Sequence, residues 1–109
     1  MAFKTRSLRY LGGISGHGVV QRDGKTVAPV QFDLDGYFRP AVGVTGSGEI
    51  KLPPETLEGL FGRSDLQLLT DSGLRLSLRF SDSKLPPASD FVGVEVTGPA
   101  SFTPEDWAA

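Results

Sequence analysis

Apolar and polar residues alternate along the segment 66–80, and this alternation constrains the fold more than any other feature of the sequence. Leu74, Leu76, Leu78 and Phe80 occupy every second position. A period of two places successive side chains on opposite faces of a strand, so one face is predicted to meet a core and the other to meet water. The segment is therefore predicted to end in a half-buried β-strand.

This strand is predicted to be the second half of a hairpin. Asp71-Ser72-Gly73 suits a three-residue loop built on a type I turn, in which the glycine takes a positive φ. Placing Thr70 opposite Leu74 brings the leucines of both strands onto one face. The pairs predicted by this register are Leu66 with Leu78 and Leu68 with Leu76.

The same alternation, on even-numbered positions, recurs along most of the chain. One or two bent strands are predicted across 7–21, and their glycines suit the corners of a barrel. Further strands are predicted over 30–34, through Phe38, Val42 and Val44, and over 49–52 and 91–97. Proline cannot donate a ladder hydrogen bond, so prolines are expected at strand ends, edges or bulges. This applies to Pro29 and to Pro40, which both fall within the alternating pattern. The expected turns are Asp23-Gly24, Asp35-Gly36 and Gly46-Ser47-Gly48. Even-numbered apolar residues of this pattern include Leu8, Tyr10, Ile14, Val20, Val30, Phe32, Leu34, Phe38, Val42, Val44, Val92, Val94 and Val96.

The pattern becomes helical at two places. Leu57, Leu60 and Phe61 have the i, i+3, i+4 spacing of a short helix over 53–61, which we expect to cover an open barrel end or the gap between two sheets. Near the C-terminus, Thr103 is predicted to be the N-cap of a docked helical turn, with Asp106 as its capping partner and with Phe102 and Trp107 as a hydrophobic staple. The segment from Ser81 to Asp90 is expected to be a polar, exposed loop.

Together these patterns predict one all-β domain over residues 1–109. Its expected form is a small antiparallel barrel or barrel-like sandwich of about six to eight strands, with one short helix (residues 53–61) and a C-terminal helical turn. The sequence contains no cysteine, so a disulfide framework or a thiolate metal site is not expected. No apolar run marks a signal peptide or a membrane span, and a cytoplasmic location is therefore expected.

The charge balance and the motifs exclude several classes of function. Eleven Lys and Arg against thirteen Asp and Glu give a net charge of −2, so no bulk attraction to nucleic acid or to an anionic membrane is expected. The glycine-rich run 12–18 matches neither of the glycine spacings of phosphate-binding loops, GxGxxG and GxxxxGK, and strand curvature explains the run better.

His17 is the only histidine of the sequence. Ser15 could approach it, with Asp23 or Asp33 as the orienting acid, but no nucleophile motif surrounds the serine. No metal site is expected. Glu55, Glu58 and Asp65 could be considered as paired acids for glycoside hydrolysis. Their simplest role is to place negative charge near a helix N-terminus, which the helix dipole favours.

A cationic face is the strongest candidate for a ligand site. Arg75 and Arg79 share the polar face of the predicted strand, and Lys51 or Arg9 could join them from a neighbouring strand. The spacing of the two arginines is similar to the RxxxR motif of PilZ domains, small bacterial barrels that bind a cyclic dinucleotide. In that family the motif precedes the first strand and a DxSxxG element follows it. Here the arginines lie within a strand and no DxSxxG follows, so the chain is not assigned to that family.

We therefore expect a non-catalytic binding or assembly module that self-associates through its strand surfaces, most simply as a homodimer. An alternative is a domain that binds a small anionic ligand or a nucleotide through Arg75 and Arg79, and a third is an enzyme without a recognisable active-site motif. A deep pocket lined by the two arginines would favour the ligand-binding alternative, whereas a flat, mostly apolar surface would favour assembly. No cofactor is expected, and the partner is expected to be a second copy or another protein.

Overall fold

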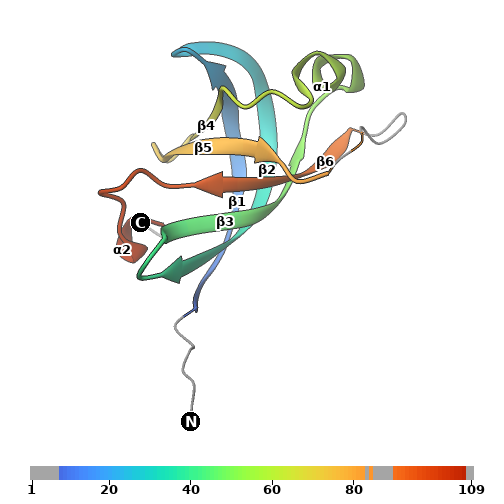
Figure 1. The fold of residues 1–109 in the computed structure, drawn as a ribbon. Helices are drawn as coiled ribbons and strands as arrows, with labels where there is room; N and C mark the ends of the chain where they lie inside the picture. Colours follow the sequence, from blue (N-terminus) through green and yellow to red (C-terminus); the bar gives the residue numbers. More distant parts are fainter. Residues whose placement is uncertain (1–7, 83, 85–89, 108–109) are drawn as a thin grey trace.

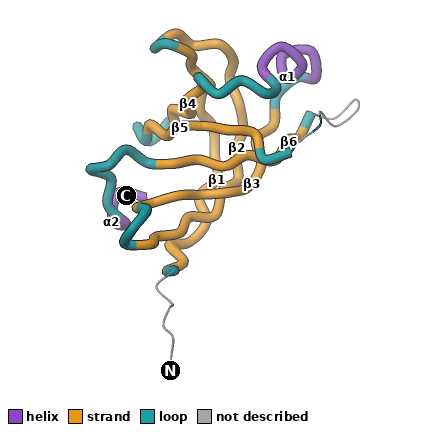
Figure 2. Tube along the Cα trace, viewed as in Figure 1, coloured by secondary structure: helices purple, strands orange, loops and turns teal. Residues whose placement is uncertain are grey.

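The chain forms a closed antiparallel barrel in the order β1-β2-β3-β6-β5-β4 (Figure 1). The computed structural model describes residues 8–82, 84 and 90–107. Strands make up most of this part, as Figure 2 shows. The prediction of a small all-β barrel is confirmed, and the closed sheet decides against a sandwich. The strands are β1 (Arg9–Arg22), β2 (Lys25–Arg39), β3 (Gly43–Lys51), β4 (Leu66–Thr70), β5 (Arg75–Phe80) and β6 (Phe91–Thr97).

The hairpin of β4 and β5 has the predicted register. Leu66 lies opposite Leu78 and Leu68 opposite Leu76, and these leucines are buried. The Thr70 N–H donates to the Leu74 carbonyl at 2.9 Å, and the Leu74 N–H donates to Thr70 Oγ1 at 3.0 Å. The hydroxyl of Thr70 therefore supplies a backbone partner at the point where the ladder ends.

Gly73 has a φ of +99°, as the predicted turn requires, and a Cβ at this position would have no heavy atom within 4 Å. We expect Gly73→Val to lower the free energy of unfolding by about 1 kcal/mol or more, because a β-branched side chain strains this backbone conformation. Gly73→Asn is the matched control, since asparagine tolerates a positive φ better. Urea unfolding of both variants measures the difference. Equal stability of the wild type and the valine variant would contradict this account of the turn.

Even-numbered side chains point into the barrel along most of the strand length, which confirms the predicted parity. The long hairpin of β1 and β2 turns at Asp23 and Gly24, both with positive φ, as expected. Pro29 lies where β2 pairs with β1 alone, because the pairing of β2 with β3 begins at Gln31. Pro29 thus has the predicted edge position. The buried core includes Val20, Val30, Phe32, Leu34, Val44, Ile50, Leu66, Leu68, Leu76, Leu78, Val92, Val94 and Val96.

Two expected turns are wrong. Asp35-Gly36 lies inside β2, and Gly46-Ser47-Gly48 lies inside β3. Their glycines allow close packing rather than chain reversal: a Cβ on Gly36 would overlap the Trp107 ring, and a Cβ on Gly46 would lie 2.7 Å from Trp107 Cη2. The true β2–β3 turn contains Pro40 and Val42, and it is closed by a 2.9 Å hydrogen bond from the Val42 N–H to the Arg39 carbonyl.

The even-position pattern also fails at three apolar residues. Val42 is 59% exposed because it lies in that turn. Tyr10 is 58% exposed because a β-bulge between Tyr10 and Gly12 shifts the phase of β1, so that Leu11 packs against the core instead. Leu8, which precedes the bulge, is 53% exposed. These residues therefore lie on the surface.

Two short helices cover opposite sides of the barrel (Figure 1). The predicted helix is α1 (Pro54–Leu60), and its Leu57 and Leu60 join the core. At α2 (Pro104–Trp107), Thr103 and Asp106 exchange the expected capping hydrogen bonds. No helix of the described ranges has the length and apolar character needed to cross a membrane. The loop expected from Ser81 to Asp90 lies partly outside the described residues.

Trp107 is the largest buried side chain of the barrel, with 1% of its surface exposed. Its indole lies against the two strand glycines Gly36 and Gly46. The Nε1–H donates a 3.0 Å hydrogen bond to the Gly12 carbonyl of β1. Trp107 therefore connects α2 to β1, β2 and β3, and the docked C-terminal turn is confirmed.

Candidate functional site

The two arginines of the predicted cationic face point outward from β5 but have different surroundings. Arg75 Nη1 donates to Gln21 Oε1 at 2.6 Å and to Gln67 Oε1 at 3.2 Å. Arg79 lies opposite Glu95 of β6. It also lines a shallow depression with Asp23 and Asp65, whose carboxylates repel an anion. Protein acceptors thus already engage the Arg75 guanidinium, and acidic residues neighbour Arg79.

The other two predicted cations are not brought to this face. Lys51 ends β3, which β6 separates from β5, and its Nζ lies 3.8 Å from Asp90 Oδ2 and 5.3 Å from the centre of the Phe91 ring. Arg9 lies opposite Phe38, at the start of β1. The four residues therefore do not form one site.

The acids considered on and after the first helix do not form a catalytic pair. Glu55 and Glu58 are exposed on α1. Asp65 accepts hydrogen bonds from Arg63 Nε at 2.9 Å and Nη2 at 2.7 Å. These bonds favour the charged carboxylate and lower the pKa of Asp65. Asp65 thus serves a local ion pair.

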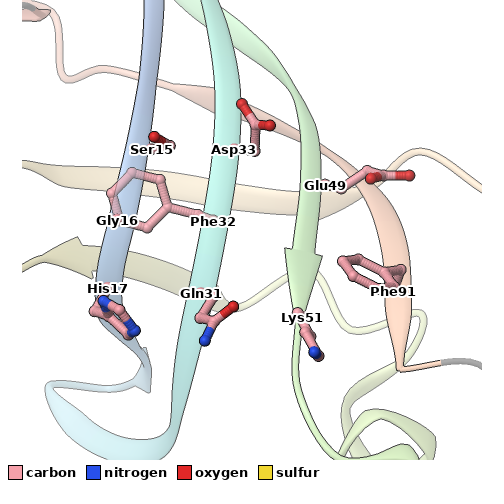
Figure 3. A pocket seen from close by; sticks show the side chains of 9 residues that line it. All are labelled: Ser15, Gly16, His17, Gln31, Phe32, Asp33, Glu49, Lys51 and Phe91. Atoms are coloured by element: carbon pink, nitrogen blue, oxygen red, sulfur yellow. The ribbon is translucent and has the colours of Figure 1, made fainter.

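A depression lies on the outer barrel face, over strands β1, β2, β3 and β6 (Figure 3). His17, Gln31, Lys51 and Phe91 lie directly opposite one another on the adjacent strands β1, β2, β3 and β6. Ser15, Asp33 and Glu49 form the next row in the same register. The depression between these rows has a volume of about 360 Å³ and also includes Gly16 and Phe32.

The floor of this depression depends on Gly16. A Cβ at Gly16 would lie 3.7 Å from Phe32 Cζ, so the phenyl ring directly underlies this point of β1. Figure 3 shows the Phe32 ring extending from β2 toward Gly16. The glycine-rich run is therefore part of a strand, as expected, and it leaves the ring near the surface.

A second depression, of about 350 Å³, continues the first along the strands. The two share His17, Gln31 and Lys51. The second depression is more apolar and lies where β3 leaves β2 toward α1. We call the two together the outer groove. Its second half is lined by His17, Pro29, Val30, Gln31, Lys51, Leu52, Pro53, Pro54 and Asp90.

Ser15 and His17 both line the outer groove, and Asp33 lies opposite Ser15. In the part of the chain that the structure describes, no hydrogen bond joins their side chains, so they do not have the geometry of a hydrolytic triad. Within the same ranges, no group of three or more His, Cys, Asp or Glu side chains has the arrangement of a metal site.

A second surface lies at the start of β1 and the end of β2. Three of the exposed large apolar residues, Leu8, Tyr10 and Val42, gather there. Tyr10 packs against Tyr37 with ring centres 5.5 Å apart. The Tyr10 hydroxyl donates to Asp35 Oδ1 at 2.7 Å, and this bond raises the pKa of Tyr10. We call Leu8, Tyr10, Tyr37 and Val42 the tyrosine end.

Sequence reasoning did not find either surface. The outer groove consists largely of odd-numbered residues of β1, β2 and β3, so parity alone could have placed them outside. Their alignment depends on the register of β2 with β3, which the two wrongly placed turns concealed. The tyrosine end depends on the bulge before Gly12, for which only the glycines of β1 gave a signal.

Comparisons of the chain with protein-family models, with curated proteins and with solved structures gave no match. Inferences about function therefore rest on the sequence and the geometry alone.

Proposed function

We propose that the protein is a non-catalytic assembly module that self-associates through the tyrosine end. The observation that carries this proposal is the gathering of Leu8, Tyr10 and Val42, each more than half exposed, beside the Tyr37 ring. Exposed apolar residues are normally scattered on a monomer, and a contiguous group marks a contact surface. Tyrosine suits such a surface because its ring packs while its hydroxyl stays hydrogen-bonded.

A second copy is the partner that this surface fits best. A two-fold interface brings the same patch from each copy together, so apolar residues of one tyrosine end meet those of the other. A depression of about 180 Å³ between Leu8, Tyr37, Arg39, Val42 and Thr45 offers a place for an apolar side chain of the partner. The neighbouring Arg39 supplies a polar rim, which is typical of protein interfaces.

The binding of a small anion through Arg75 and Arg79 has less support. Such a site needs free guanidinium donors that converge, whereas Arg75 is engaged by two glutamines and Arg79 lies opposite Glu95. An enzymatic function likewise lacks a group of side chains in catalytic geometry within residues 8–82 and 90–107.

We expect Val42→Asp to weaken self-association by about tenfold or more, because a charge would be buried in an apolar contact. Val27→Asp is the matched control: Val27 is also an exposed valine, at 40%, but lies at the opposite end of β2. Sedimentation of a dilution series measures the effect. It should be run at 0.1 M and 1 M salt, where the Debye length is about 10 Å and about 3 Å.

A dimer that persists at 1 M salt and is weakened only by Val42→Asp supports the proposal. A monomer at every concentration would remove the assembly function. Equal weakening of the dimer by Val42→Asp and Val27→Asp would mean that the interface lies elsewhere. A dimer lost only at high salt would point to ion pairs that include the arginines.

A further inference from the structure

We propose that the outer groove binds an extended peptide segment of a partner protein, with an arginine or lysine side chain over Asp33 and Glu49. This inference does not rest on the proposed self-association, because the outer groove and the tyrosine end share no residue. It assigns a ligand chemistry to the outer groove of the barrel.

The acidic half of the outer groove contains an uncompensated pair of charges. Asp33 of β2 and Glu49 of β3 lie directly opposite each other on the outer face. Such cross-strand partners have Cβ atoms about 4.5–5.5 Å apart, and like charges at this distance destabilise a sheet. Among the described residues, neither carboxylate has an ion-pair or side-chain hydrogen-bond partner. A cation placed between them would remove the repulsion.

The protein's own nearest lysine is directed elsewhere. Lys51 lies two residues from Glu49 on the same face of β3, so it is the natural candidate to neutralise the pair. Its ammonium instead lies 3.8 Å from Asp90 Oδ2 and over the Phe91 ring at 5.3 Å. Figure 3 shows the Lys51 and Glu49 side chains lying apart. The acidic half of the groove therefore stays open to a cation from outside.

The shape of the groove favours a peptide over a small cation. From Asp33 to Pro29, β2 spans four residues, or about 13 Å at the usual rise of a strand. The two continuous depressions along this length suit about four residues of extended chain. The acidic half accepts the cationic side chain, and the half lined by Pro29, Leu52 and Pro53 accepts an apolar side chain about four residues away.

Other occupants fit less well. A metal ion lacks a third ligand, since no group of three or more candidate ligands occurs in the described ranges. Nucleic acids and anionic lipids would bring phosphates to the two carboxylates, which repel them. A guanidinium group, in contrast, donates hydrogen bonds in a planar fork that matches carboxylate oxygens.

The test uses a nonapeptide with one central arginine and a leucine four residues away on each side, acetyl-Leu-Thr-Ser-Thr-Arg-Thr-Ser-Thr-Leu-amide. Because the sequence reads the same in both directions, the peptide can place its arginine and one leucine in the groove in either chain direction. The control peptide carries citrulline, a neutral isostere, in place of arginine. Fluorescence anisotropy of labelled peptides gives the dissociation constants, and amide shifts of Gln31, Gly48 and Glu49 by NMR locate the bound peptide.

We expect the citrulline peptide to bind at least about fivefold more weakly than the arginine peptide, as for the loss of two partly exposed charge contacts. The double variant D33N/E49Q should weaken the arginine peptide by the same factor and leave the citrulline peptide unchanged. The control variant E58Q/E105Q removes the same net charge from exposed positions outside the groove, and it should change binding by less than about twofold.

Three results would overturn the proposal: no binding of the arginine peptide at millimolar concentration, equal affinity for the two peptides, or equal loss in D33N/E49Q and E58Q/E105Q. The last would indicate only non-specific charge attraction. Sedimentation of D33N/E49Q keeps this test separate from self-association, since the variant should dimerise as the wild type does.

Discussion

Replacing Trp107 with alanine should lower the free energy of unfolding by about 3–5 kcal/mol, the usual range for a buried aromatic residue. The indole fills the space above Gly36 and Gly46, and it bonds to the Gly12 carbonyl at 3.0 Å. A domain of this kind is typically stable by only about 5–15 kcal/mol, so the loss is a large fraction of the total. Urea unfolding followed by circular dichroism measures it, since the variant lacks the only tryptophan.

Two further variants separate the causes. Trp107→Phe keeps an aromatic ring but loses the hydrogen bond to Gly12, and its stability should lie between those of the wild type and the alanine variant. Glu105→Ala changes an exposed residue of the same helix and should have little effect. If Trp107→Ala unfolds at the same urea concentration as Glu105→Ala, α2 does not contribute to the barrel core.

Truncation of Leu76 or Leu78 to alanine should cost about 2–5 kcal/mol each. Both leucines are fully buried on β5, with 0% and 1% exposure. They face Leu68 and Leu66 across the β4–β5 pairing. Each truncation removes apolar burial and leaves a cavity that the stiff barrel closes only in part.

Ser77→Ala is the matched control, because Ser77 lies between the two leucines and points outward. The fluorescence of Trp107 follows unfolding in all three variants. A urea midpoint for the leucine variants no lower than that of Ser77→Ala would mean that the face of this strand is assigned backwards.

The sequence predicted the fold class and the inward face because these follow from local patterns. In the β4–β5 hairpin, strand alternation and turn chemistry agree, and the register was predicted residue by residue. Leu57 and Leu60 were recognised in the same way by helical spacing. Such features are determined by residues that are close together in the sequence, so they can be predicted from the sequence alone.

The errors arose where glycine has a tertiary role. Gly36 and Gly46 look like turn residues, yet they lie within strands because an indole about 60–70 positions away along the chain packs on them, as tertiary contacts override local preference. Turns at these glycines would split β2 and β3 into shorter strands. The alignment of Asp33 with Glu49, which needs the full register of both strands, could not be predicted for that reason.

The cationic face shows a related limit. Arg75 and Arg79 were correctly placed on one outward face, because β5 alone determines that. Whether their charge is available depends on other strands: Gln21 comes from β1, Gln67 from β4 and Glu95 from β6. A ligand site of this kind requires knowledge of which strands are neighbours, and strand order in a barrel is not a local property.

The bond between Trp107 and Gly12 joins residues 95 positions apart, and this separation has a consequence for biosynthesis. Of the six strands β1 is made first, but its pairing with β4 must wait for residues 66–70, and its contact with the indole must wait for residue 107. Until then the apolar inner faces of β1, β2 and β3 have no cover. Such non-local closure slows folding and exposes the nascent chain to aggregation. The barrel core is therefore completed only once residue 107 has been made, and a chain interrupted shortly before α2 would leave Gly36 and Gly46 without the indole that covers them.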